Sequence, residues 1–147
     1  MEKRVVITGM GIYSCLGKTL EEGLRFAVKA ENDEVEIISI GFLTSISRVF
    51  QAYPHLAKKV KRLWIMGGKW DEQGGLEYNF CGNGNRDVIQ ASRFVVNELD
   101  VEKVFLGFEM GADVFTGRRL LEEDILGRAL NAYGCTHGRE SWDPMLV

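Results

Sequence analysis

Acidic and amide side chains follow a short apolar run in the middle of the sequence. Residues 63–66 (LWIM) are typical of a buried strand, which stops at Gly67-Gly68, and the glycine-rich loop beyond it carries Glu77 and Asn79. In an open α/β sheet, carboxylates and amides that follow the end of a strand build a ligand site at the carboxyl edge of the sheet. This stretch therefore predicts a ligand site in the loop.

Alternating strands and helices must position this loop. Apolar runs predict strands at residues 4–8, 35–40, 63–66 and 104–106, and segments with one apolar helical face separate them. Asn85 has a side chain suited to capping the helix that follows the loop. The repeated strand–helix order predicts an α/β fold with three layers and a mostly parallel sheet. The length of 147 residues predicts a single domain, residues 1–147.

The last third of the chain has weaker patterns. Residues 116–123 and 124–133 are expected to form short helices. Asp143 precedes Pro144, which is typical of a helix start with proline at the first helical position. Asp143 could therefore be a helix cap, which needs no partner, or a metal ligand, which needs other oxygens nearby.

Composition excludes several classes of function. A net charge of −3 argues against nucleic acid as a main partner. No stretch is apolar over the length of a membrane span, and the first residues do not resemble a signal peptide. The chain has 3 cysteines, an odd number that cannot form a complete disulfide framework. We therefore expect a cytoplasmic protein.

Residues 24–147 resemble the inosine-uridine-preferring nucleoside hydrolases. The resemblance lies in ordered segments that include the loop described above. The matching segments are VEIISIGFLTSISRVFQAYPHLAKKVKRLWIMGG (35–68), LEYNF (76–80), FLGFEMGADVFTG (105–117) and GRESWDPMLV (138–147). The resemblance implies a nucleoside or ribose as the bound small molecule. It also implies hydrolysis of the N-glycosidic bond of ribonucleosides as the ancestral activity.

The resemblance implies a role for particular residues. Glu77 and Asn79 would bind the substrate by hydrogen bonds to the ribose, and the Ser39 carbonyl and the Asp143 carboxylate would bind calcium. Cleavage of an N-ribosidic bond builds positive charge on the sugar, as in other glycosidases. Such chemistry requires groups that hold the sugar hydroxyls and a hard cation that acidifies a water.

The sequence also departs from the family. The family's opening strand ends in an aspartate-rich motif, DxDxGxDD, which supplies most metal ligands and the aspartate that activates water. RVVITGMGIYSC (4–15) stands in that place, and no aspartate precedes Asp33. Trp142 replaces a family histidine, and Asp71 stands where an asparagine is expected. A calcium site needs about six to eight oxygens, so the implied site is incomplete.

The opening residues resemble a different family. VVITGMGIYSCLGKTLEE (5–22) is similar to the first strand and turn of the β-ketoacyl synthases, and residues 1–22 carry none of their catalytic motifs. We therefore expect a truncated or recombined nucleoside hydrolase-like chain, possessing weak or absent hydrolysis and no catalytic residue. The alternatives are a non-catalytic ribose-binding module, or a fragment whose unpaired sheet edge drives homo-oligomerisation.

Overall fold

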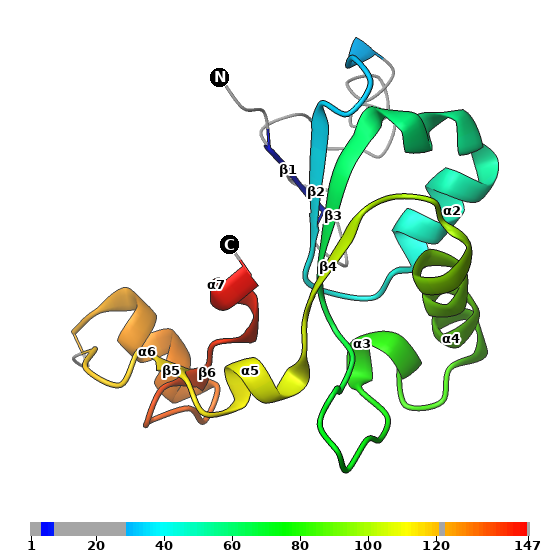
Figure 1. Ribbon diagram of the computed structural model, residues 1–147. Coiled ribbons are helices and arrows are strands. Elements are labelled where there is room, and N and C mark those ends of the chain that lie inside the picture. Colours follow the sequence, from blue (N-terminus) through cyan, green and yellow to red (C-terminus); the bar gives the residue numbers. More distant parts are fainter. Residues whose placement is uncertain (1–3, 8–28, 121–122, 147) are drawn as a thin grey trace.

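A parallel sheet forms the centre of the molecule. Figure 1 shows the computed structural model, which describes residues 4–7, 29–120 and 123–146. The strands lie in the order β1-β2-β3-β4, and every neighbouring pair is parallel. Their bounds are β1 Arg4–Ile7, β2 Val35–Ser39, β3 Val60–Met66 and β4 Lys103–Leu106. This arrangement confirms the predicted α/β class and its mostly parallel sheet.

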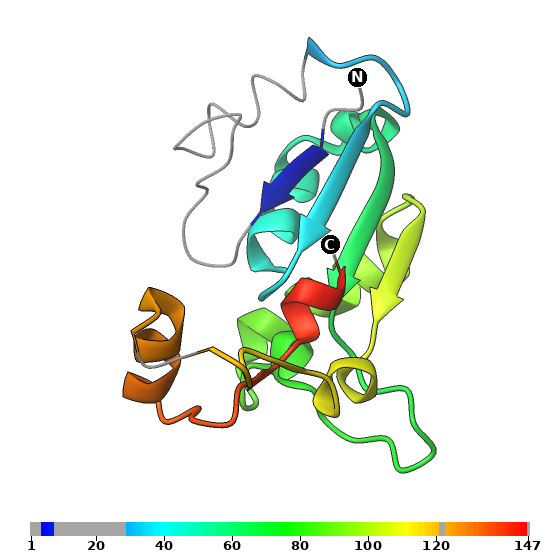
Figure 2. The same ribbon diagram turned by 90° about the vertical axis from the view of Figure 1, so that its left-hand side faces the viewer.

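Helices cover one face of this sheet and enclose the core. They are α2 (Thr44–Ala52), the 3₁₀ helix η1 (Pro54–Lys59), α4 (Arg86–Arg93) and the π-helix η2 (Phe94–Glu98). In Figure 2 these helices lie behind the sheet. Their apolar residues meet alternate residues of the central strands, because side chains alternate between the two faces of a strand. Fully buried members of this core include Leu43, Ile46, Leu63, Ile65 and Val95.

The loop between β3 and α3 (Tyr78–Cys81) begins at the carboxyl edge of the sheet. The register pairs Ser39 with Ile65 and Met66 with Leu106, so three strands end near one level. Asn85 then caps α4 as expected, since its Oδ1 accepts hydrogen bonds from the backbone N–H groups of Asp87 (2.9 Å) and Val88 (3.3 Å). The predicted strand end at Met66 and the predicted cap at Asn85 are confirmed.

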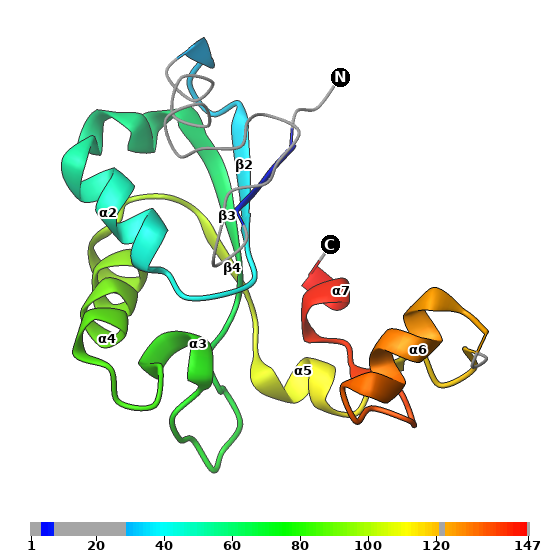
Figure 3. The ribbon, with the colours of Figure 1, turned by 180° about the vertical axis from the view of Figure 1, so that it is seen from behind.

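Residues 108–146 form an extension that we call the C-terminal arm. It contains α5 (Phe108–Ala112), β5 (Phe115–Thr116), α6 (Ile125–Ala132), β6 (Arg139–Glu140) and α7 (Trp142–Leu146). Figure 3 shows α5 and α6 projecting away from the sheet, whereas α7 turns back toward it. Contacts of α7 with β3 and β4 place this helix on the face opposite α2 and α4.

The structure corrects one prediction in the arm. Residues 116–123 were expected to be helical, but Thr116 belongs to β5, which pairs antiparallel with β6. Gly117 has φ +92 and begins a turn, in which the Leu120 N–H bonds to the Gly117 carbonyl at 3.1 Å. A helix cannot continue through that left-handed conformation. The second predicted helix, 124–133, corresponds to α6.

Two further sequence predictions concern the opening residues and the possibility of a membrane span. Apart from β1, the resemblance of residues 1–22 to β-ketoacyl synthases falls largely outside the described residues and stays a prediction. In the described part of the chain, no helix combines the length and apolar character that crossing a membrane requires.

Candidate functional site

A cavity of about 600 Å³ lies at the carboxyl edge of the sheet, and we call it the rim cavity. Its wall combines Ile40 after β2, the β3–α3 loop, and residues of α3, α5 and α7. Glu77, Asn79 and Asp143 all line it. Three of the four residues singled out from the sequence are thus brought together, although 64 positions separate Asn79 from Asp143.

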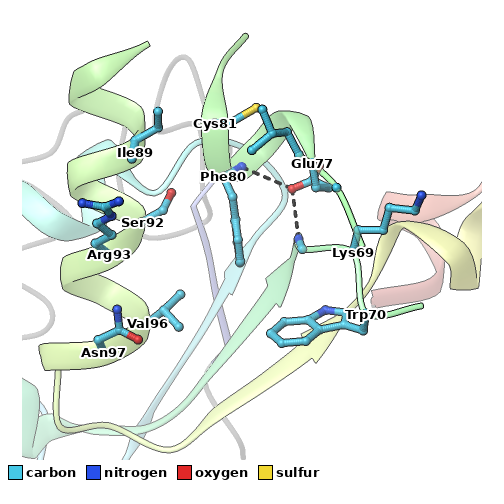
Figure 4. Close-up of a pocket in the computed structure, with 13 residues that line it drawn as sticks. Lys69, Trp70, Glu77, Phe80, Cys81, Ile89, Ser92, Arg93, Val96 and Asn97 are labelled. Carbon is cyan, nitrogen blue, oxygen red and sulfur yellow. Dashed lines mark hydrogen bonds between the residues drawn. The ribbon is translucent and has the colours of Figure 1, made fainter. Parts of the chain in front are cut away.

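Glu77 closes the loop that forms one side of the rim cavity. It is buried, with 7% of its surface exposed, and it is the N-cap of α3. Its Oε1 accepts from the Asn79 N–H at 2.8 Å, and its Oε2 accepts from the N–H groups of Gly68 (3.0 Å) and Phe80 (3.2 Å). The two Oε2 bonds are drawn in Figure 4. A carboxylate offers about four acceptor positions, so backbone groups use most of this capacity.

Asn79 is held against the end of β3. Its Nδ2 donates to the Met66 carbonyl at 3.1 Å and lies 3.0 Å from the Met66 sulfur. Among the described residues, no donor hydrogen-bonds to its Oδ1. The strand end therefore fixes the amide, and one acceptor oxygen stays available at the cavity wall.

Asp143 lies at the mouth of the rim cavity. Partial burial raises the pKa of its carboxyl above the ordinary value of 3.8, and the positive charge of Arg139 opposes that shift. The neighbouring Trp142 anchors α7, because its indole N–H donates to the Phe108 carbonyl at 2.7 Å and its ring stacks on Phe108 with centroids 5.1 Å apart. Contacts within the arm therefore position Asp143.

Asp143 does not precede its helix, so the predicted cap is wrong. Helix α7 already begins at Trp142, and the Met145 N–H bonds to the Ser141 carbonyl at 3.0 Å. Pro144 is then the third helical residue. That position tolerates proline, because the first four N–H groups of a helix have no partner within it. The residue before the helix, Ser141, is buried, and its Oγ forms a hydrogen bond with the Thr116 Oγ1 (2.6 Å). The helix thus starts two residues earlier than expected.

Ser39 is the predicted site residue that does not line the rim cavity. It ends β2 and is 2% exposed, whereas the next residue, Ile40, is in the wall. Lys69 and Arg139, by contrast, were not singled out from the sequence and line the cavity. Lys69 directly follows the glycine pair, which was a usable signal. No sequence motif around Arg139 indicates a site residue, because Arg139 reaches the cavity only when the arm folds back.

These residues do not fit a calcium ion. Calcium requires about six to eight oxygen ligands, and Glu77 is already committed to backbone N–H groups. Two cationic side chains share the wall with Asp143. No cluster of three or more histidine, cysteine or acidic side chains suited to a metal occurs within residues 29–120 and 123–146. The cavity described here is suited to a polar organic molecule instead.

Comparisons with known proteins agree with the resemblance of the sequence. The model of the family described as "Inosine-uridine preferring nucleoside hydrolase" matches residues 15–134. A uridine nucleosidase of Saccharomyces cerevisiae is 33% identical over 86 residues, which cover 58% of this chain and 25% of that protein. The matched part thus spans about a quarter of the relative's length. The family match includes Glu77 and Asn79 and ends before Asp143.

Proposed function

Because the chain belongs to the inosine-uridine preferring nucleoside hydrolase family, we propose that it binds a ribonucleoside in the rim cavity and hydrolyses it weakly or not at all. One observation carries the proposal: Glu77, Asn79 and Asp143 line the same cavity. Its volume of about 600 Å³ lies within the range of small-molecule sites. We treat residues 1–147 as one nucleoside hydrolase-like unit.

Ribose recognition in this proposal depends on acceptors that meet the sugar hydroxyls. The Asn79 Oδ1 is one acceptor, and the remaining lone pair of the Glu77 carboxylate is another. Tyr78 lies between them in sequence and is 57% exposed, so its ring is available to the nucleobase. Glu77 mainly positions the loop, whereas Asn79 contacts the substrate.

Weak hydrolysis follows from the small number of groups in the described wall of the rim cavity that could activate a water. The oxocarbenium-like transition state needs a water activated by a carboxylate or by a metal. Backbone hydrogen bonds occupy Glu77, so Asp143 is the other carboxylate that the described wall offers. The family typically binds a metal ion, but the Ser39 carbonyl and Asp143 are too few ligands to hold calcium strongly. We therefore propose that this chain binds a nucleoside but has little or no hydrolytic activity.

Calorimetric titration with uridine and inosine tests the proposal. We expect saturable binding that weakens about tenfold in Asn79→Ala, since one hydrogen bond to the ribose is lost. Asn131→Ala on the exposed side of α6 is the matched control and should bind normally. No heat at millimolar nucleoside would contradict the proposed binding.

A base-release assay with and without calcium tests the proposed weak catalysis. We expect little or no turnover in either buffer. Rapid calcium-dependent hydrolysis that disappears in both Asp143→Asn and Glu77→Ala would overturn that part of the proposal. Asp113→Asn, an exposed acid elsewhere in the arm, controls for general effects of removing a charge.

A second candidate function is self-association through the edge of the sheet. Among the described strands, β4 pairs only with β3, and its four residues are half-buried. Lysine often protects such edges, but the Lys103 ammonium is turned back onto the carbonyls of Leu99 (2.6 Å) and Val101 (3.1 Å). We expect a concentration-dependent dimer in sedimentation velocity; a monomer at all concentrations would exclude it.

A further inference from the structure

A second cavity, of about 480 Å³, lies on the other side of the β3–α3 loop. We call it the α4 cavity, because residues of α4 and η2 form one wall and the loop with α3 forms the other. Figure 4 shows Ile89, Ser92 and Val96 on the side of the helix that faces Phe80, and Arg93 and Asn97 also line the cavity. It shares part of the loop with the rim cavity, but none of α5 or α7. Nothing in the proposed nucleoside site uses this space.

A buried hydroxyl without a partner lines the α4 cavity. Ser92 is 5% exposed, and its Oγ hydrogen-bonds to no described residue. A serine within a helix can bond back to the carbonyl four residues earlier, but Ser92 does not. Buried polar atoms nearly always have a partner, so an unpaired one that borders a cavity indicates a missing hydrogen-bonding group.

The helix that carries Ser92 changes its winding at the cavity. Residues Phe94–Glu98 form a π-helix directly after α4, and Val96 and Asn97 from this segment line the cavity. π-helical turns are rare and occur frequently at functional sites. This segment adds an apolar and an amide side chain to the lining of the cavity.

The remaining walls specify the chemistry of an occupant. Trp70 is 56% exposed, and Phe80 lies across from α4, so aromatic surface is available for a planar ring. The guanidinium of Arg93 is exposed at the mouth and forms no ion pair with any residue of the described part of the chain. A guanidinium binds carboxylates through two parallel hydrogen bonds. An apolar space with few convergent polar groups is the usual form of a small-molecule site.

We infer that the α4 cavity binds a small aromatic carboxylate. Its ring lies against Trp70 and Phe80, the Ser92 hydroxyl hydrogen-bonds to it, and its carboxylate pairs with Arg93 at the mouth. This inference is independent of the proposed nucleoside binding, because Ser92 and Arg93 do not line the rim cavity.

Calorimetry of the full chain with indole-3-acetate as the probe tests the inference. We expect one saturable site, with affinity about tenfold lower in Ser92→Ala and in Arg93→Gln, the loss of one good hydrogen bond or ion pair each. Val96→Trp should abolish binding by filling the cavity. The neutral indole-3-acetamide should bind more weakly to the unmodified chain, and Arg93→Gln should remove that difference.

Thermal unfolding separates a ligand-binding hydroxyl from a structural one. Without the probe, Ser92→Ala should unfold at the same or a higher temperature, since the hydroxyl it removes has no partner. The probe should raise the unfolding temperature of the unmodified chain more than that of Ser92→Ala. Asp143→Asn, in the rim cavity, should leave probe binding unchanged even if nucleoside binding fails altogether.

Three results would overturn the inference. One is the absence of probe binding at millimolar concentration. Another is binding that persists unchanged in both Ser92→Ala and Val96→Trp. The third is a lower unfolding temperature of Ser92→Ala without the probe, because the hydroxyl would then have a structural partner.

Discussion

The two halves of the molecule differ in how they are held together. Among the residues whose burial the structure describes, every member of the main apolar core lies between Ala30 and Leu99, in the sheet and its covering helices, and none belongs to the C-terminal arm. The arm, which projects away from the sheet in Figures 1 and 3, instead exposes many large apolar side chains. Those at least 39% exposed are Phe108, Met110, Val114, Leu120, Ile125, Leu126, Tyr133 and Met145.

Only a few contacts attach the arm to the sheet. The Phe108 N–H donates to the Gly68 carbonyl at 2.8 Å, and α7 contacts β3 and β4. Within the arm, Trp142 joins α7 to α5. Gly111 allows this contact within the arm, since a Cβ there would lie 2.4 Å from the Trp142 Cδ1 atom. The comparison teaches that the stability of the fold depends on the sheet, whereas the completeness of the rim cavity depends on the weakly held arm.

Substituting one isoleucine in each half should give the largest difference in the free energy of unfolding between the halves. Ile65→Ala in β3 removes a 0% exposed side chain and should lower the free energy of unfolding by about 2–5 kcal/mol. Ile125→Ala in α6, at 75% exposure, should change it by less than about 0.5 kcal/mol. Urea unfolding at constant slope measures both. Equal losses would show that the arm has a core of its own.

Removing the Glu77 carboxylate should give the next largest effect. Glu77→Ala leaves the N–H groups of Gly68 and Asn79 without their acceptor, while the Phe80 N–H keeps the Glu77 carbonyl, and should cost about 1–3 kcal/mol. Glu72→Ala, an exposed acid of the same loop, is the control and should be nearly neutral. A neutral Glu77→Ala in urea unfolding would mean that the loop does not need this cap.

Gly111→Ala should release the arm with little effect on the sheet. The added methyl group also clashes with the Trp142 backbone, at 2.7 Å from Cα, and α7 must move. We expect faster proteolysis within the arm and a change of less than about 0.5 kcal/mol in the unfolding of the sheet.

Gly134→Ala is the control for that release. Gly134 lies in the same arm, and a Cβ added there would meet nothing within 4 Å, so the substitution strains only the local backbone at φ +85. If Gly111→Ala unfolds the sheet and the arm together, the two halves are one cooperative unit.

The smallest effect should be an opposite pH response in the two halves. In the sheet, the Trp64 indole N–H (2.9 Å) and then the Lys61 ammonium (3.4 Å) lower the pKa of Glu36 below 4.5. This stabilisation is present above pH 4.5 and is lost as pH falls through the lowered pKa. In the arm, burial raises the pKa of Asp143, so its contribution to stability declines as pH rises from 3.8 through the raised value.

Carboxyl NMR titrations, with urea midpoints against pH, measure these responses. Glu36→Gln should remove the loss of stability that occurs as pH falls below 4.5. Asp143→Asn should remove the decline in stability that occurs as pH rises above 3.8. Shifts of the same sign at Glu36 and Asp143 would contradict the assigned causes.

The sequence predicts the sheet half far better than the arm, for physical reasons. Central parallel strands are largely buried, so β2 and β3 contain the apolar runs 37–38 and 63–66, and Asn85 marks a helix start through its own side chain. The pairing of β5 with β6 joins residues far apart in sequence over two residues each, which leaves no alternating pattern to recognise.

The same contrast applies to the candidate site. Glu77 and Asn79 were found because they directly follow a strand and a glycine pair. Arg139 was missed because its place in the rim cavity depends on the fold of the arm. The capping role of Glu77 was missed because glutamate is not one of the preferred N-cap residues, although its capping bonds to the Asn79 and Phe80 N–H groups are local. Its bond to the Gly68 N–H, nine residues earlier, has no local signal.

The carboxylate of Glu77 fastens both ends of the β3–α3 loop, and this makes residues 69–76 suitable for grafting. Extra residues inserted at Gly74, which has φ +59 and where an added Cβ would meet nothing within 4 Å, would lie between ends that are already tied together. Doubling the length of such a loop costs only about 0.6 kcal/mol of closure entropy. A reporter peptide or an added recognition segment could therefore be carried there without shifting the strand before it or the helix after it.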